Sequence, residues 1–558
     1  MVEKYDVVIV GAGIAGSSAA YYLARKGYKV IVLEKAHVPG QRNSSGGVIY
    51  TSYIEGYGLK DLIPELYSEA PLERRIKDYK LWILSKPDKS NGHRYRFLDL
   101  SETFLDRMIH GEAEKSEGYS VLRSRFDRWL ASKVLEAGGI VVTDATGESL
   151  IRENGRIVGV RTYKEEIYGD LVIDASGVTS TLVIEAGLRG YLEPEHVYHG
   201  IKHVYELGES EIEERFKLGK GEGVAIAIMG DFMYGSKGGG FIYTNRNTIS
   251  IGLVLEMSSM LKALEKHRDS IGKPLDMLEE MESHPEIARL IEGGKLVEYS
   301  AHNIPKGSKI YLRKPYTSGF IAVGDALGAF VKIGAMIDGM RRAVATGIMA
   351  AKTFEIARSR GLFTEAALSV YQDLLRPITR DIERYKRQSI LSESSLLYGY
   401  GYKIMLKIMG RERIFRGDIR RASGDAIKKV QERINILKYN ENKEYIHIDV
   451  DYENANRDPR KLWVSACPMN CYTLVVEGKG VFASYKDLYL FNLEQSRLRK
   501  SGDRGSAMRE TLRDISMGKL RFDHVSCVEC GTCWFIGPPN IIRFHHQRDG
   551  KGVKYQYG

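Results

Sequence analysis

The sequence predicts an α/β protein that ends in a separate α+β domain. Three observations support this prediction. An apolar strand, a glycine loop and a helix open the chain, strand-and-turn patterns recur at 168–177 and 318–330, and all five cysteines lie between Cys467 and Cys533. The 558 residues suffice for about three or four domains. The 43% apolar and 28% charged residues are typical of a globular protein and exclude fibrous and disordered classes.

The N-terminal segment has the order strand, glycine loop, helix, strand. Residues 5–10 form an apolar, β-branched run, and Gly11, Gly13 and Gly16 follow it in G-x-G-x-x-G spacing. In such a loop the first glycine makes a tight turn, the second lets the backbone approach a pyrophosphate, and the third lets the helix pack on the strand. The next strand ends in Glu34, an acid placed to bind the ribose hydroxyls of an adenosine. The segment therefore predicts a dinucleotide site.

Two later segments favour FAD over NAD. One predicted strand ends in the turn at Gly177, and another ends at Gly324 and Asp325. An aspartate at such a strand end can hold the sugar-alcohol chain of FAD, and the alternative is that it only caps a turn. The following helix is expected to begin near Gly339 and to direct the positive end of its dipole at the flavin ring.

The cysteine spacing predicts one [4Fe–4S] cluster. Cys527, Cys530 and Cys533 have C-x2-C-x2-C spacing, and Cys467 is followed by proline, as is the remote fourth ligand in bacterial ferredoxins. Cys471 is then a spare thiol. The alternative is a structural zinc ion held by Cys467, Cys471, Cys527 and Cys530, which leaves Cys533 unexplained.

The order of these motifs resembles that of the FixC-type flavoproteins, which belong with the electron-transfer-flavoprotein:quinone oxidoreductases and, more distantly, with the geranylgeranyl reductases. The resemblance extends from residue 1 to about 440, and it also rests on the segments 39–50, 121–139, 238–254 and 298–305. The cysteine-containing tail, with its closing DGKGVKYQYG, resembles the ferredoxin-like FixX protein. The chain thus resembles a FixC–FixX fusion, with CPMNC where the family usually has a C-P-A-G turn.

The resemblance implies a Rossmann-type FAD-binding domain at 1–180, completed by 310–360, with an inserted β-rich substrate or quinone domain at 181–309. A helical segment, 361–445, and a ferredoxin-like domain, 446–558, follow. The residues expected to bind FAD are Gly11, Gly13, Gly16, Glu34, Lys35, Arg123, Gly177, Gly324 and Asp325. For Arg123 the alternative is a surface position at the start of a helix. Gly238, Gly239 and Gly240 are expected to face the flavin or quinone, or else to form a hairpin turn.

The resemblance also implies a function. The expected reaction transfers electrons from reduced electron-transfer flavoprotein through one [4Fe–4S] cluster and FAD to a membrane quinone. One form of this expectation makes the protein a subunit of an electron-bifurcating complex. No catalytic residue is assigned and no nucleic-acid partner is expected. Two alternatives stay open: an FAD-dependent geranylgeranyl or polyprenyl reductase, and a non-catalytic electron-relay subunit.

Hydropathy predicts a cytoplasmic protein, and the membrane quinone that the resemblance implies favours a peripheral position on the inner face of the cell membrane. No apolar run reaches the roughly 18–20 residues that span a bilayer, and no signal sequence precedes the first strand. The net charge of +10 suits anionic lipids or acidic partners, or a solvated basic surface. Residues 389–417 mix apolar side chains with Lys and Arg, as in an interfacial helix or a packed helical pair. The 13 histidines show no ligand spacing, and His545 and His546 are expected at the surface.

Overall fold

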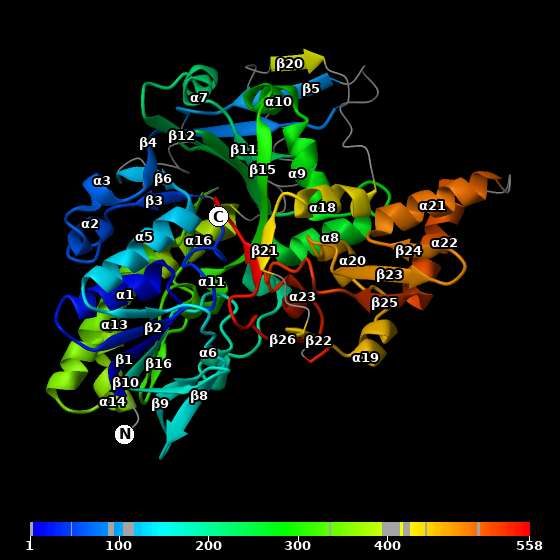
Figure 1. Ribbon diagram of the computed structural model, residues 1–558. Helices are drawn as coiled ribbons and strands as arrows, with labels where there is room; N and C mark the ends of the chain where they lie inside the picture. Colours follow the sequence, from blue (N-terminus) through cyan, green and yellow to red (C-terminus); the bar gives the residue numbers. More distant parts are fainter. Residues whose placement is uncertain are drawn as a thin grey trace.

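The computed structural model describes residues 4–45, 47–87, 94–103, 116–333, 336–392, 413–416, 425–440, 444–498, 503–538 and 540–558. These residues form two large sheets and a C-terminal domain (Figure 1). The predicted membrane-interfacial stretch 389–417 lies largely outside the described residues. Within them, no helix is long and apolar enough to cross a membrane.

The first sheet is parallel at its centre and carries the glycine loop. β1 (Lys4–Val10) pairs in parallel with β10 (Glu166–Asp174) on one side and with β2 (Val30–Leu33) on the other. β10 also pairs in parallel with β17 (Phe320–Ala322), and β2 with β7 (Ile140–Val142). The sheet therefore joins strands from distant parts of the chain, in the discontinuous arrangement that was expected. The remaining members are β16 (Tyr316–Thr317), β8 (Ser149–Glu153) and β9 (Arg156–Arg161).

Helices cover this sheet. α1 (Ile14–Ala24) follows β1 directly and contacts both α13 (Met340–Ser359) and α5 (Arg123–Glu136). The start of α13 after Gly339 confirms the predicted helix boundary. The central strands are apolar and buried on both faces, as parallel strands between helices are. The long helix α16 (Arg376–Ser392) and several short helices complete this part of the chain: α2 (Leu59–Leu62), α3 (Leu66–Glu69), α6 (Leu182–Glu185), α12 (Gly324–Leu327), α14 (Glu365–Leu368) and α15 (Val370–Leu374).

The second sheet has ten strands and is mostly antiparallel. From the predicted substrate domain come β11 (Val197–Glu206), β12 (Glu222–Gly230), β13 (Gly238–Thr244), β14 (Thr248–Glu256) and β15 (Lys295–Pro305). The others are β3 (Val48–Tyr50), β4 (Leu72–Leu84), β5 (Arg94–Asp99), β6 (Gly118–Val121) and β20 (Arg413–Arg416). The expected boundary at residue 180 is therefore wrong in part, because β3, β4, β5 and β6 belong to the second sheet. The helices of this region are α7 (Glu209–Phe216), α8 (Met257–Lys266), α9 (Pro274–Glu282), α10 (Pro285–Ile291) and α11 (Gly307–Ile310).

The C-terminal region forms a small α+β domain, coloured from yellow through orange to red in Figure 1. Its strand pairs are β21 (Lys438–Asn440) with β27 (Gly552–Lys554), and β22 (Ile448–Val450) with β26 (Ile542–Phe544). A third sheet contains β23 (Tyr472–Val476), β24 (Gly480–Phe482) and β25 (Lys519–Phe522). The helices are α18 (Ala426–Ile434), α19 (Tyr452–Arg457), α20 (Trp463–Ala466), α21 (Tyr485–Leu498), α22 (Arg504–Met517) and α23 (Thr532–Phe535).

This domain shares its core with the second sheet. One cluster of buried apolar residues contains side chains of β11 to β15 and all five cysteines. Polar bonds cross the same boundary: Asn303 Nδ2 donates to the Cys530 carbonyl oxygen over 2.7 Å, and Lys273 Nζ donates to that of Cys467 over 2.9 Å. The cysteine-rich domain is thus packed into the rest of the chain.

Candidate functional site

A cavity of about 220 Å³ lies at the carboxyl ends of the strands in the first sheet. Ligands bind at this edge of doubly wound α/β sheets, where successive strands diverge on either side of the first one. Eight of the nine residues expected to bind FAD line the cavity: Gly11, Gly13, Glu34, Lys35, Arg123, Gly177, Gly324 and Asp325. The ninth, Gly16, lies beneath the loop.

Two glycines of the motif, Gly11 and Gly16, are packed so closely that a side chain does not fit. Gly11 has a φ of +101°, and a Cβ there would lie 2.6 Å from the carbonyl oxygen of Ala175 after β10. A Cβ at Gly16 would lie 2.0 Å from the carbonyl oxygen of Gly11. Both obstacles are backbone atoms, which cannot rotate away. Gly16 therefore fixes the distance between the loop and α1, whose first turn borders the cavity.

Replacing Gly16 with alanine is expected to weaken FAD binding by about tenfold or more, since overpacking costs about 1–3 kcal/mol. Bound flavin per chain and the FAD dissociation constant, followed by fluorescence quenching, measure the effect. Gly190→Ala is the matched control, because a Cβ at Gly190 meets nothing within 4 Å. Equal FAD affinities in Gly16→Ala and the wild type would contradict this role.

Glu34 lies directly after β2 and is 7% exposed. Its Oε2 accepts a hydrogen bond from the Ala12 backbone N–H and its Oε1 accepts one from that of Ala36, both over 2.8 Å. Burial raises the pKa of the carboxyl group, while the two N–H donors act to lower it. The carboxylate is thereby fixed at the rim of the glycine loop.

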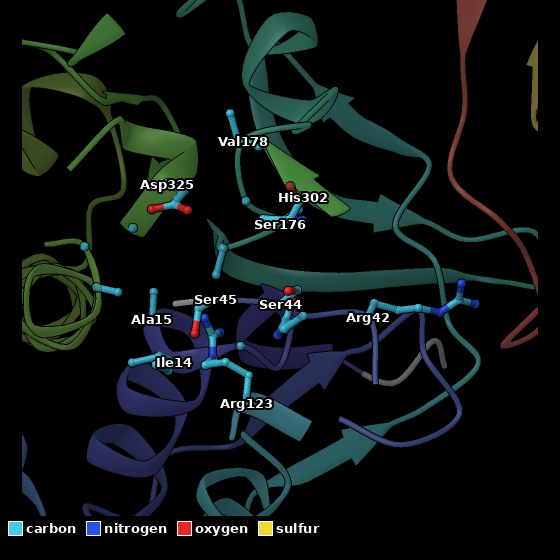
Figure 2. Close-up of a pocket in the computed structure, with 18 of the residues that line it drawn as sticks. Ile14, Ala15, Arg42, Ser44, Ser45, Arg123, Ser176, Val178, His302 and Asp325 are labelled. Carbon is cyan, nitrogen blue, oxygen red and sulfur yellow. The ribbon is translucent and has the colours of Figure 1, made fainter. Parts of the chain in front are cut away.

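Arg123 and Asp325 approach the cavity from different elements (Figure 2). Arg123, the first residue of α5, donates from Nε and Nη2 to the buried carboxylate of Asp127 over 2.8 and 2.7 Å. Burial raises the pKa of Asp325 to about 6, and the charge of Arg123 opposes that rise. The N-terminus of α13 also reaches the cavity through Gly339 and Met340, which places a positive helix dipole there.

Several lining residues were missed in the sequence. Glu529, between two cysteines of the C-terminal motif, has its carboxylate in the cavity lining. Its Oε2 accepts from Arg42 Nη1 over 3.2 Å and lies 3.4 Å from Lys35 Nζ. Burial acts to raise the pKa of Glu529, but the charges of Lys35 and Arg42 outweigh it and lower the pKa well below the ordinary value. In the sequence, only the position of Glu529 within the cysteine motif could have indicated a role at this site.

The expectation that His546 lies at the surface is wrong. Its side chain is 8% exposed and lines the cavity, with Nδ1 3.1 Å from Lys35 Nζ and 3.7 Å from Glu529 Oε1. The neighbouring His545 is 53% exposed, because successive residues of an extended segment face opposite sides.

The donors around the cavity fit the diphosphate of FAD. Lys35, Arg42 and Arg123 supply cationic side chains, and the first turn of α1 supplies backbone N–H groups. Within the described residues Arg42 Nη2 is buried without a hydrogen-bond partner. A buried guanidinium nitrogen normally has an acceptor, and a phosphate oxygen would supply one.

The three glycines expected to face the flavin or quinone do not line this cavity in the described part of the chain. They lie on β13 and do not form a hairpin turn. A Cβ at Gly238 would meet the Val254 carbonyl oxygen at 2.0 Å, and one at Gly240 would meet Met281 Sδ at 2.3 Å. Glycine is needed here because β14 and α9 pack closely, and only Tyr243, near the opposite end of the strand, reaches the cavity.

A second, smaller cavity is lined by all five cysteines. Cys467 follows α20, Cys533 lies in α23, and the Cys471 thiol is within hydrogen-bond reach of both Cys467 and Cys527. No carboxylate or imidazole lines it among the described residues. In the same part of the chain, no group of three or more His, Cys, Asp and Glu side chains is arranged to hold a metal ion. The donor set, five buried thiols, is the chemistry that iron–sulfur clusters use.

The two cavities share one wall. Val528 lines both of them, and its neighbour Glu529 faces the first. On the far side of the cysteine loop, a Cβ at Gly531 would lie 2.7 Å from Thr179 Cγ2 of the first cavity's lining. The cysteine loop is therefore in direct contact with the predicted FAD site.

The fold and the glycine-loop cavity define a flavin-dependent oxidoreductase. The family described as FAD dependent oxidoreductase matches residues 6–234. FixC of Bradyrhizobium diazoefficiens is 35% identical over 391 residues, which cover 69% of this chain and 84% of that protein. FixC of Escherichia coli K12 is 36% identical over 402 residues, covering 71% and 88%.

The chain therefore belongs to the FixC family, and the expected flavoprotein class and FAD cofactor are confirmed. A geranylgeranyl bacteriochlorophyll reductase-like protein of Thermoplasma acidophilum has 19% identity and a TM-score of 0.47, with 73% of this chain and 89% of that chain covered.

Proposed function

We propose that the chain transfers electrons from reduced electron-transfer flavoprotein to a membrane quinone through one [4Fe–4S] cluster and FAD. One observation carries this proposal: Val528 lines both the FAD cavity and the cysteine cavity, so the two cavities share a wall. Two redox sites in such contact suit direct electron exchange. The docking of the partner flavoprotein, a place at the inner membrane surface and membership in a bifurcating complex are parts of the same proposal.

The roles of the chain's own residues follow from their positions. Cys467, Cys527, Cys530 and Cys533 would ligate the cluster, and Lys35, Arg42 and Arg123 would hold the FAD diphosphate. When bound, the cluster exchanges single electrons and the flavin exchanges one or two. The apolar lining of the cysteine cavity would exclude water from the cluster.

The test is a turnover assay on the purified protein with both cofactors loaded. Reduced electron-transfer flavoprotein is mixed with a soluble quinone analogue, and quinone reduction is followed by absorbance. We expect catalysed reduction, and its loss in Cys527→Ser protein that still holds FAD. Absence of quinone reduction by the fully loaded protein would refute the proposal.

The same preparation separates the alternatives. Saturation of a geranylgeranyl substrate without quinone reduction would favour a lipid reductase, and a flavin spectrum unperturbed by quinone would favour a relay subunit. Both outcomes count against the proposal.

A further inference from the structure

We propose that His447 is a positioning residue that raises the reduction potential of the cluster by donating a hydrogen bond to Cys527. This inference rests on the proposed cluster. The His447 side chain is completely buried, and its Nε2 lies 3.3 Å from Cys527 Sγ. A thiolate ligand accepts such a bond, which is stronger when the cluster carries the additional negative charge of its reduced state.

The tautomer of His447 is assigned by its other neighbour. Gln547 Nε2 lies 2.7 Å from His447 Nδ1. An amide nitrogen can only donate, so Nδ1 accepts and the ring proton resides on Nε2, facing the sulfur. The imidazole therefore acts here in its neutral form as a donor to Cys527, and no change of protonation is involved.

Gln547 is itself held by the lining of the FAD cavity. Its backbone N–H donates to Glu529 Oε1 over 2.7 Å, and its carbonyl oxygen accepts from Thr146 Oγ1 over 2.6 Å. Glu529 and Thr146 both line the FAD cavity. A continuous chain of buried hydrogen bonds thus runs from the predicted flavin site through Gln547 and His447 to a predicted cluster ligand.

The backbone around His447 keeps the imidazole in place. The His447 carbonyl oxygen accepts from the His545 N–H over 2.8 Å, at the end of the ladder between β22 and β26. Hydrogen bonds from residues around the metal ligands orient those ligands and change the redox potential of the metal site. Because the ring is fixed from both sides, its effect should appear in the redox equilibrium of the cluster with no loss of iron.

The test compares reduction potentials by EPR-monitored titration of the holoprotein. At a fixed potential, His447→Phe is expected to raise the oxidised-to-reduced ratio of the cluster about tenfold, a shift of about 59 mV to lower potential. His447→Gln, whose amide nitrogen can reach the same position, should recover most of the shift. The control is His545→Gln, because His545 is 53% exposed.

The outcomes are distinct from those of the proposed function. Equal cluster potentials in the wild type and His447→Phe, with full iron content in both, would overturn this inference even if quinone reduction proceeds. If His447→Phe does not hold the cluster, Gln547→Met provides the test instead. This variant removes the donor that keeps the His447 proton on Nε2, so the reduction potential of the cluster should again fall. An unchanged potential in that variant would also overturn it. A wild type without any cluster would instead refute the proposed function.

Discussion

Glu529→Gln is expected to lower the free energy of unfolding by about 3–5 kcal/mol at pH 7. The Glu529 side chain is 2% exposed and accepts from Arg42, which is 6% exposed, while Lys35 lies on its other side. Removing one partner of a buried ion pair leaves the other charge uncompensated and desolvated, and this cost exceeds the value of the pair itself. Urea unfolding of the FAD-free protein, followed by circular dichroism, measures the change, because bound FAD would bring its diphosphate to Lys35 and Arg42.

The control for this variant is Glu136→Gln. Glu136 is 58% exposed and forms an ion pair with Lys133 on the surface of α5, so its loss should change stability by about 0.5 kcal/mol or less. Equal unfolding midpoints for Glu529→Gln and the wild type would show that the Glu529 carboxylate is not held by the two cations.

The effect of Glu529 should depend on pH in one direction. The folded-state pKa of Glu529 lies well below its ordinary value, so the carboxylate stabilises the fold fully above the unfolded-state pKa of about 4.3. This stabilisation is lost as pH falls towards the folded-state pKa. The free energy of unfolding of the wild type should therefore exceed that of Glu529→Gln most at pH 6–7, and this difference should be lost below about pH 4. A constant difference across this range would contradict the ion-pair account.

Cys527→Ser is expected to reduce the iron content from about four atoms per chain to about none, with a parallel loss of acid-labile sulfide. Cys467→Ser should do the same, because Cys467 is the proposed fourth ligand. FAD content should stay unchanged, since no cysteine lines the FAD cavity in the described residues. Iron, sulfide and flavin assays on anaerobically purified protein provide the measurement.

Cys471→Ser is the matched control and should keep a full cluster. Its thiol lies beside both Cys467 and Cys527, so the comparison tests whether a neighbouring thiol is also a ligand. A full cluster in Cys467→Ser together with its loss in Cys471→Ser would reverse the choice of ligand. If the wild type contains zinc and no acid-labile sulfide, the cysteines hold a structural zinc ion and the proposed cluster is wrong.

Contiguous motifs were predicted well because their geometry is local. The G-x-G-x-x-G segment forms the turn between β1 and α1, where the close contact of Gly16 with Gly11 needs only residues next to each other in the chain. The start of α13 after Gly339 is equally local. Such features depend on backbone conformation and helix boundaries, which nearby residues dictate.

The pairing of distant segments was not predicted. β3, β4, β5 and β6 join the second sheet, where β4 pairs with β12 across a long sequence separation. His546 and Glu529 also reach the FAD cavity from the opposite end of the chain. No local pattern marks a charged residue that will be buried against a partner hundreds of positions away.

The sequence by itself determined the dinucleotide loop, the flavoprotein family and the cysteine motif, because these depend on residue identity at short spacing. Only the tertiary structure decided that the cysteine cavity borders the FAD cavity at Val528, and that Glu529 lies against Lys35 and Arg42. The physical reason is that burial and charge pairing between remote segments arise only when the domains pack together.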